Sequence, residues 1–472
     1  MVFSSNIFLF LFLPVFLGLY YLTPFRHRSW VILIGSYAFY AWWRVDFLLL
    51  FVAVTLWNYL MGLGIHRAGV GSRAARKWVA IGVTGDLATL GYFKYANFGV
   101  DSLNSLLASA GSQPLEMAHI ILPIGISFYI FQAISYVIDV YRGDTEATRR
   151  FVDFAAFIAL FPQLIAGPVL RYKDLADQFA ERTHTLEKFS EGAGRFMQGF
   201  VKKVFIADSI APLADHAFAL ADPTTSDAWL GALAYTAQLY FDFSGYSDMA
   251  IGLGLMMGFR FIENFNQPYI SQSITEFWRR WHISLSTWLR DYLYIPLGGN
   301  RGSTFLTYRN LLLTMLLGGL WHGANWTFLI WGAWHGTLLA FERAMGTSGN
   351  PKGFRFSRWL FTFFCVVLGW VTFRATNLSE AFAFYGAMFT FDGAGLSTDY
   401  LQGIRTLNLA ILALAYGVVA LMGLRDRLQH RGLTFMQVNW RSYAMPMLLP
   451  LFALSVLKLS AESFSPFLYF QF

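Results

Sequence analysis

Long runs of apolar residues without Asp, Glu, Lys or Arg dominate the chain. Such runs cover Met1 to Phe25, Phe47 to Ile65 and Thr406 to Leu424. About 20 apolar residues suffice for a helix to cross about 30 Å of hydrocarbon. The shorter runs from Ser29 to Trp43 and from Trp359 to Phe373 predict further helices whose flanking arginines reach the interface. Backbone groups must bond internally in lipid, so we predict helices, about ten to twelve of them at membrane depth.

The composition supports this interpretation. Of the 472 residues, 56% are hydrophobic and only 13% are charged, whereas soluble domains are about 25% charged. No hydrophilic stretch is long enough to form a separate soluble domain. We therefore predict an all-α, polytopic membrane protein with a single domain over residues 1–472. The formal charge of +7 is explained by basic loops that face anionic lipid, so we expect the lipid bilayer, and no nucleic acid, as a partner.

The basic loops also predict an orientation. Arg26 and Arg28 follow the first apolar run, and the stretch from Arg67 to Lys77 follows the third. Basic loops stay cytoplasmic, which places the N-terminus outside. The first run has no basic residue before it and no small-residue cleavage pattern after Leu22, so we expect a retained helix rather than a signal peptide.

Two segments do not have the pattern of simple spans. Phe151 to Leu170 contains Pro162 and the pair Gly167-Pro168, which break helices, and this predicts a re-entrant hairpin at a cytoplasmic cavity. The polar stretch from Tyr172 to Lys188 is expected to form a helix at the cytoplasmic surface.

The stretch from Ile274 to Tyr294 mixes tryptophans with arginines and is too charged to span. We expect an interfacial helix, or a buried one with its charges paired. On such a helix His282 and Ser286, four residues apart, share a face.

Two Trp-His-Gly triplets lie in the uncharged stretch from Asn310 to Phe341, and they contain His322 and His335. An ionisable group at membrane depth costs free energy and by default marks a functional site. As one helix these residues would be about 48 Å long, so the stretch must tilt, break or turn back. We predict the break at Gly323-Ala324-Asn325.

Depth distinguishes the two histidines. His322 lies about 20 Å along a helix from Arg309, near mid-membrane, whereas His335 lies only about 10 Å from Glu342. On one common helix they would be rotated about 220° apart. We therefore predict that His322 is catalytic and that His335 is a hydrogen-bonded core residue.

A histidine with a pKa near neutrality can act as a general base on a hydroxyl. Zinc sites need about three converging ligands, and His282, His322 and His335 lack close ligand spacing, so we predict no metal. A proton relay in a transporter stays open at this point.

A third cluster contains Asp242, Ser244, Tyr246 and Asp248 within the otherwise apolar run from Ala228 to Phe259. Bare carboxylates there are costly, so each needs a partner. At helical spacing Asp242 and Tyr246 share a face, as do Ser244 and Asp248. Two interpretations stay open, a hydrogen-bond network between helices and the lining of a reaction tunnel.

The chain offers a base without an evident nucleophile. It has no GxSxG, Walker A or GxGxxG motif, and its single cysteine, Cys365, has nothing basic nearby in sequence. We expect Cys365 to be a packed hydrophobic residue. This pattern favours direct transfer between two bound substrates.

Two motifs carry a family resemblance. WRRWHISLSTWLRDY, from Trp278 to Tyr292, is followed about forty residues later by GGLWHG, which contains His322. This two-part pattern resembles the membrane-bound O-acyltransferase (MBOAT) family. YFDFSGYSDMAIG from Tyr240, together with the ending from Ser463 to Phe472, resembles the branch that acetylates alginate. The resemblance covers essentially the whole chain.

The resemblance implies an MBOAT fold in which cytoplasmic and periplasmic funnels meet near His322. It implies an enzyme of the bacterial inner membrane with a periplasmic N-terminus. The donor would be a cytoplasmic acetyl thioester, most simply acetyl-CoA, with no bound cofactor. The acetyl group would pass to a periplasmic acetyltransferase partner of the alginate machinery. His322 carries over as the catalytic residue and His282 as the second motif histidine.

The residues themselves fit this chemistry. A deep His322 takes the proton from a serine or sugar hydroxyl, and the alkoxide attacks the thioester. Asn325 is a candidate donor to the oxyanion, and a water-poor channel limits hydrolysis. The remaining candidates for substrate contact or tunnel lining are Asp242, Ser244, Tyr246, Trp321 and Ser286.

Two alternatives remain. The acceptor could be another envelope polymer, namely cellulose, peptidoglycan or teichoic acid. A proton-coupled transporter could use His322 as a relay, although transporters usually show paired repeats with broken helices, and none is found here.

Overall fold

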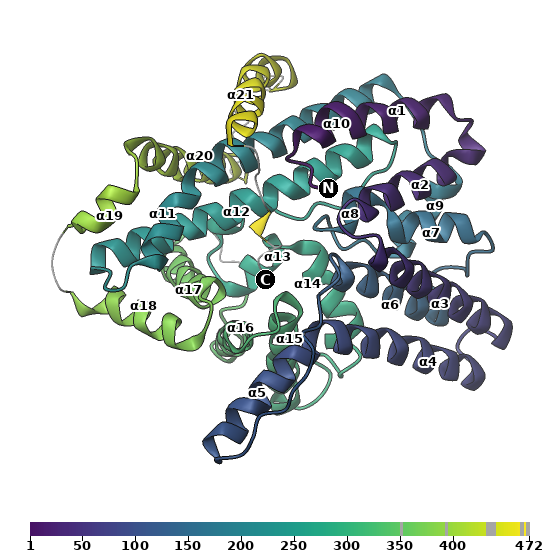
Figure 1. The fold of residues 1–472 in the computed structure, drawn as a ribbon, viewed down its shortest axis with the longest axis horizontal. Coiled ribbons are helices and arrows are strands. Elements are labelled where there is room, and N and C mark those ends of the chain that lie inside the picture. Colours follow the sequence, from purple (N-terminus) through teal and green to yellow (C-terminus); the bar gives the residue numbers. More distant parts are fainter. Residues whose placement is uncertain (350–352, 392–394, 431–439, 463–466, 469–472) are drawn as a thin grey trace. The chain divides into compact units, whose positions relative to one another are not determined.

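The computed structural model describes residues 1–349, 353–391, 395–430, 440–462 and 467–468 (Figure 1). Helices are the only regular elements in these ranges. The prediction of an all-α protein is confirmed.

The chain divides into two compact units. The first comprises Met1–Ala193 and Ala250–Ile262, and the second comprises Gly194–Met249 and Glu263–Phe472. The long helix α12, Thr225–Met256, contributes residues to both. The expectation of a single domain over residues 1–472 stays a prediction.

The helices that begin in the first unit are short or of medium length. In chain order they are η1 Phe8–Phe12, α1 Leu13–Leu22, η2 Phe25–His27, α2 Arg28–Ala41, α3 Asp46–Ala68, α4 Arg73–Leu90, η3 Gly91–Tyr95, α5 Ala96–Ser109, α6 Ile126–Arg142, α7 Phe151–Ala159, α8 Phe161–Leu164, α9 Tyr172–Ala180 and α10 Leu186–Phe200.

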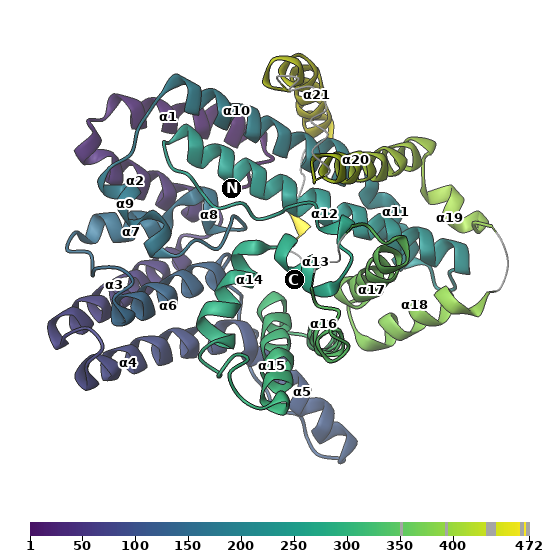
Figure 2. The same ribbon diagram turned by 180° about the vertical axis from the view of Figure 1, so that it is seen from behind.

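Helices α3, α4 and α6 lie side by side in the first unit (Figures 1 and 2). Small residues allow their close approach. A Cβ on Gly62 of α3 would lie 2.5 Å from the Tyr136 ring of α6, and one on Gly82 of α4 would lie 3.1 Å from Met61. Side chains larger than hydrogen would push these helices apart.

The predicted break in the Phe151–Leu170 segment is present. Helix α7 ends at Ala159, and Leu160 leaves the helical region with φ −47° and ψ 101° before α8 begins. The freed Phe161 N–H donates to the Ser36 hydroxyl at 3.1 Å. Residues 154–170 are buried throughout, which is where non-helical backbone is tolerated in a membrane protein. Re-entry into the membrane stays a prediction.

The helix predicted from Tyr172 to Lys188 is shorter than expected. Helix α9 ends at Ala180, where Glu181 is extended, and α10 begins only at Leu186. Residues near the N-terminus hold the connection between α9 and α10. Arg182 donates to the Tyr20 hydroxyl at 3.0 Å, and Arg28 contacts His184 at 2.9 Å. Burial and the neighbouring arginines lower the pKa of His184 to about 4.

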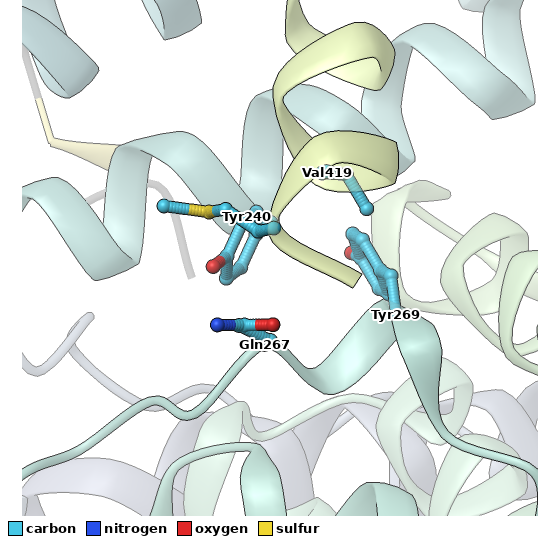
Figure 3. Close-up of a pocket in the computed structure, with 5 residues that line it drawn as sticks. Tyr240, Gln267, Tyr269 and Val419 are labelled. Atoms are coloured by element: carbon cyan, nitrogen blue, oxygen red, sulfur yellow. The ribbon is translucent and has the colours of Figure 1, made fainter. Parts of the chain in front are cut away.

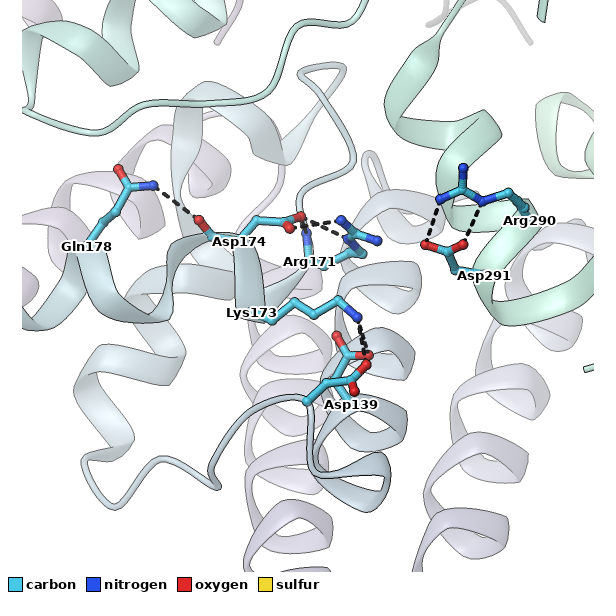
Figure 4. Close-up of polar contacts among 8 residues, drawn as sticks. Asp139, Arg171, Lys173, Asp174, Gln178, Arg290 and Asp291 are labelled. Carbon is cyan, nitrogen blue, oxygen red and sulfur yellow. Dashed lines mark hydrogen bonds and ion pairs between the residues drawn. The ribbon is translucent and has the colours of Figure 1, made fainter. Parts of the chain in front are cut away.

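Ion pairs fix α9 in the first unit (Figure 4). Lys173 contacts Asp139 of α6 at 3.3 Å and Asp144 at 2.8 Å. Arg171 pairs with Asp174 at 2.9 Å and closes the first turn of α9. The polar side chains at the start of this stretch therefore form ion pairs within the first unit.

The helices that begin in the second unit range from short turns to the long α12. They are η4 Val201–Ala207, α11 Asp208–Ala219, α12, η5 Pro268–Ile270, α13 Ile274–Arg280, α14 Ile283–Leu289, η6 Arg290–Tyr294, α15 Thr304–His322, α16 Trp326–Ala344, α17 Phe356–Arg374, α18 Leu378–Thr390, α19 Thr398–Gly403, α20 Thr406–His430 and α21 Trp440–Glu462.

Three stretches of the described residues are long and apolar enough to cross a membrane. They are Asp46–Ala68, Phe356–Arg374 and Thr406–Arg425, with the shorter apolar stretch Phe8–Leu22 beside them. Each lies on a run that the sequence pattern predicts. The number of helices at membrane depth stays a prediction.

Candidate functional site

Both Trp-His-Gly triplets lie in one helical hairpin of the second unit. Helix α15 ends at His322 and α16 begins at Trp326, with Asn325 as its N-cap. The predicted break at Gly323-Ala324-Asn325 is confirmed, and of the three possible forms the chain takes the one that turns back (Figure 2).

Glycines explain why the hairpin is tight. A Cβ on Gly319 would lie 2.2 Å from the Phe328 carbonyl oxygen, and one on Gly332 would lie 2.3 Å from the Met315 carbonyl oxygen. A Cβ on Gly323 would lie 2.1 Å from the Phe328 ring. The glycine after His322 is therefore required by packing of the returning helix.

The turn overturns one argument from the sequence. The rotation of about 220° between His322 and His335 assumes a common helix, but they lie on two helices. Their rings pack against the same indole, Trp331, with centroid distances of 5.1 Å for His322 and 5.0 Å for His335. The two imidazoles are neighbours across one tryptophan.

The first motif is also broken at its histidine. Helix α13 ends at Arg280 and α14 begins at Ile283, while His282 adopts a left-handed backbone with φ 43° and ψ 55°. The expectation that His282 and Ser286 share a helical face is wrong. Backbone bonds to a preceding segment cause the break, because Ile283 N–H donates to Asn264 O and Asn266 N–H donates to Arg280 O, both at 2.9 Å.

The break brings the two motif histidines together. The ring centroids of His282 and His322 are 6.3 Å apart, although forty residues separate them in sequence. His282 is 0% exposed and His322 is 5% exposed. Each motif therefore supplies one imidazole to a single buried site.

Aromatic rings enclose this pair. Trp321 lies 5.9 Å from His282 and 5.1 Å from His322, and Phe243 of α12 meets His282 edge-on at 4.7 Å. Phe373 of α17 lies 5.3 Å from His322. The neighbours named here are aromatic rings, and they leave both imidazoles buried.

Asn264 holds the side chain of His282. Its Oδ1 lies 3.1 Å from His282 Nδ1, and it accepts from the Ser284 hydroxyl at 2.8 Å. The amide nitrogen donates to the Ser247 hydroxyl at 2.9 Å, which connects the group to α12. Burial lowers the pKa of His282 to about 3, so this imidazole is neutral.

His335 has a different partner. The Trp278 indole N–H donates to His335 Nδ1 at 3.3 Å, and the Phe277 ring stacks on His335 at 6.1 Å. Glu342 caps α13 through Ile274 N–H at 2.5 Å and Thr275 N–H at 2.9 Å. His335 and Glu342 thus both attach α13 to α16, which agrees with the predicted structural role of His335.

The carboxylates of α12 have partners, as the sequence required. Asp242 pairs with Lys203 at 2.7 Å, and Lys203 also contacts Asp208 at 2.6 Å. Asp248 pairs with Arg195 at 2.6 Å and with Lys202 at 2.7 Å. The lysines come from η4, a π-helical segment. This arrangement supports the hydrogen-bond network over the tunnel lining.

Ser244 and Tyr246 are buried within the same helix. Tyr246 packs on Phe467 with centroids 4.5 Å apart, and Leu468 N–H donates to Asp242 at 3.1 Å. The Ser244 hydroxyl is buried without a hydrogen-bond partner among the described residues. The residue of this cluster that meets His282 is Phe243, next to Ser244 in sequence.

Two further candidates are engaged elsewhere. Asn325 accepts from Thr327 N–H at 3.0 Å and donates to Thr376 O at 2.8 Å, so its oxygen caps α16 and one amide N–H is already used. The Ser286 hydroxyl donates to Trp281 O at 3.3 Å. Trp321, by contrast, is part of the histidine site.

A small pocket of the second unit has neither motif histidine in its lining. Its lining residues are Tyr240, Gln267, Tyr269, Val419 and Met422 (Figure 3). Its volume of about 10 Å³ is that of a single water site. It is too small for an acyl donor.

Other chemistry finds no support in the described residues. No group of three or more His, Cys, Asp or Glu that could hold a metal occurs among them. Cys365 is a free thiol, 3% exposed, as expected for a packed residue. What the site offers is two buried imidazoles enclosed by aromatic rings.

Sequence reasoning missed several residues of this site. Asn264, Phe243, Trp331 and Phe373 surround the two histidines, yet they lie on four different segments and form no spaced motif. The signal available for Asn264 was weak, a polar interruption just after the apolar run of α12. Tertiary contacts alone identify it.

Comparison with known proteins identifies the family of the chain. The membrane-bound O-acyltransferase family matches residues 146–382. The chain is 66% identical to a probable alginate O-acetylase AlgI of Pseudomonas putida and 64% identical to that of Azotobacter vinelandii, with 100% of each chain covered. It is 37% identical to a peptidoglycan O-acetyltransferase of Helicobacter pylori over 84% of this chain and 81% of the relative. The chain belongs to the membrane-bound O-acyltransferase family.

Proposed function

We propose that this membrane O-acyltransferase provides acetyl groups for the O-acetylation of exported alginate. The relatives that match the full chain at 64–66% identity are named alginate O-acetylases. The observation that carries the mechanism is the pairing of His282 and His322, with ring centroids 6.3 Å apart, inside an aromatic enclosure.

In the proposed reaction His322 is the general base. It takes the proton of the acceptor hydroxyl, whose oxygen attacks the carbonyl carbon of an acetyl thioester. The new C–O bond forms, the C–S bond breaks, and the proton returns from His322 to the departing thiolate. His322 ends α15, where the negative end of the helix dipole stabilises a cation. A base of this kind contributes about 10²–10⁴-fold to the rate.

The direction of transfer follows from the charge of the loops. The basic residues after the first and third apolar runs support an inner-membrane protein with a periplasmic N-terminus. We propose a cytoplasmic acetyl thioester, acetyl-CoA in the simplest case, as the donor. The acceptor is a hydroxyl on a periplasmic acetyltransferase partner of the alginate machinery, or on the polymer itself.

A second acceptor deserves a test. The Helicobacter pylori relative is named for peptidoglycan, and it matches most of this chain. Acetylation of peptidoglycan would use the same two histidines. Measuring acetyl groups on both polymers from one strain separates the two acceptors.

The decisive experiment replaces the proposed base. His322→Ala, produced in cells that lack the wild-type chain, should abolish alginate acetylation while the protein still inserts. His66→Ala is the matched control, since His66 is exposed at the end of α3, and it should leave acetylation unchanged. Normal acetyl content in the His322→Ala strain would overturn the assignment.

The donor is tested with purified protein. Incubation with labelled acetyl-CoA should place label on the periplasmic partner, or on polymer, and only when His322 is present. Absence of any transfer from acetyl-CoA by active wild-type protein contradicts this donor.

A further inference from the structure

We infer that Asn264 is a positioning residue, which holds His282 in the tautomer whose Nε2 carries a lone pair that faces the reaction. This inference rests on the proposed function, because it assigns His282 a defined task beside His322. In this proposal His282 supplies the reaction with a second imidazole, whose Nε2 is an acceptor, and Asn264 maintains that tautomer.

The orientation of the Asn264 amide is fixed by its neighbours. The backbone N–H of Ser284 can only donate, and it lies 3.3 Å from the atom assigned as Oδ1. That atom must therefore be the oxygen. The amide nitrogen on the other side donates to Ser247 at 2.9 Å.

The tautomer of His282 follows from this orientation. An oxygen at 3.1 Å accepts, so His282 Nδ1 must carry the hydrogen and donate it. A neutral imidazole with hydrogen on Nδ1 has its lone pair on Nε2. That Nε2 is buried without a hydrogen-bond partner among the described residues. A buried acceptor without a partner is costly unless a ligand supplies the donor.

The backbone around His282 is arranged by the same residue. Asn264 O accepts from Ile283 N–H at 2.9 Å, and this bond belongs to the turn in which His282 has φ 43°. Non-glycine residues in the left-handed region cluster at functional sites. Asn264 thus fixes both the backbone turn and the ring of His282.

The groups that face His282 leave it neutral. They are Phe243 of α12, Trp321 and His322 of α15, and the Asn264 and Ser284 side chains. Among the described residues, no carboxylate, lysine or arginine side chain is found in contact with His282. Burial then dominates and lowers its pKa to about 3.

The test compares Asn264→Asp with Asn264→Leu. The carboxylate of Asp still accepts from Nδ1–H and keeps the tautomer, whereas Leu offers similar volume without an acceptor. We expect Asn264→Leu to lose about 10–100-fold in acetyl transfer, as is typical of outer-sphere partners of functional imidazoles. Asn264→Asp should recover most of that activity near neutral pH.

The pH profile gives a readout that a purely structural role would not move. A negative charge beside His282 raises its pKa by about 1–3 units. Below that pKa, Nε2 is protonated and can no longer accept a hydrogen bond. In Asn264→Asp the ¹⁵N signal of His282 should therefore report protonation of Nε2 at a higher pH than in wild type, by about the same interval.

A spectroscopic measurement makes the inference independent of activity. In purified protein with ¹⁵N-labelled histidine, wild type and Asn264→Asp should show an unprotonated Nε2 on His282, assigned by its absence in His282→Gln. Asn264→Leu should show a mixture of tautomers. Ser247→Ala, which removes only the distal partner of Asn264, is the matched control and should retain the wild-type signal.

The outcomes separate this inference from the proposed function. Wild-type transfer together with an unchanged tautomer and pH profile in both Asn264 variants would overturn the inference and leave the function standing. Failure of wild type to transfer acetyl groups would overturn the function, and the nitrogen spectrum would still decide the tautomer.

Discussion

His282 and His335 are both 0% exposed and both surrounded by aromatic rings, yet their neighbours give them opposite chemistry. At His282 an amide oxygen accepts from Nδ1, which leaves a lone pair on Nε2. At His335 an indole N–H donates to Nδ1, which places the hydrogen on Nε2. One imidazole presents an acceptor and the other a donor.

This difference shows that burial alone does not determine the hydrogen-bonding chemistry of a histidine. Desolvation makes both rings neutral in the same way. The two rings differ in the atom that lies at Nδ1, an acceptor oxygen at His282 and a donor N–H at His335. The break between α13 and α14 positions His282, whereas the packing of α13 on α16 positions His335. His335 joins α13 to α16, whereas His282 faces His322.

The strongest test of the comparison replaces each histidine by glutamine. His282→Gln removes the lone pair of an imidazole beside His322, and acetyl transfer should fall by about 10²–10⁴-fold. His335→Gln should stay within a few-fold of wild type, since its task is packing. Alginate acetyl content and transfer by purified protein report the effect. Equal losses in the two variants would remove the distinction.

The second test turns to the charged cluster on α12, where contacts are ionic rather than aromatic. Lys203→Met leaves Asp242 with an uncompensated buried charge on α12, the helix that also carries Phe243. Unfolding should become easier by about 3–5 kcal/mol. The Lys203→Met, Asp242→Leu double variant should recover much of that loss. Thermal unfolding in detergent measures both, and a double variant no better than the single one contradicts the pairing.

The smallest effect is expected for Trp278→Phe. It keeps the aromatic packing and removes only the N–H that donates to His335 Nδ1. Stability should fall by about 0.5–1.5 kcal/mol, the net value of one hydrogen bond, and acetyl transfer should hardly change. If transfer instead falls as far as in His282→Gln, His335 belongs to the reacting group and the comparison fails.

Much of the fold could be predicted from local patterns. Uncharged runs located α3, α17 and α20, and the proline and glycines of the Phe151–Leu170 segment located its break. These features depend on residues close in sequence, because helix length, apolarity and backbone freedom are local properties. The two-part motif likewise located His282 and His322 as a pair.

The errors came from features that depend on distant residues. A continuous helix through His282 was expected, but backbone bonds from Asn264 and Asn266 interrupt it. The sequence argument treated His322 and His335 as lying on opposite sides of one helix. Because α16 turns back along α15, both imidazoles pack against the Trp331 ring. Asn325 caps α16 with its side-chain oxygen, which local sequence did not indicate, and its role toward an oxyanion stays a prediction.

The sequence by itself determined that this chain is a helical membrane protein, which histidines are worth testing, and that the Asn310–Phe341 run cannot be one straight helix. Composition and periodicity suffice for this because they report the cost of placing each residue in lipid. Only the tertiary structure decided that His282 and His322 meet, that Lys203 and Arg195 neutralise the carboxylates of α12, and that Asn264 sets the tautomer of His282. Hydrogen bonding and charge pairing act over a few ångströms in space, and residues far apart in the chain supply the partners.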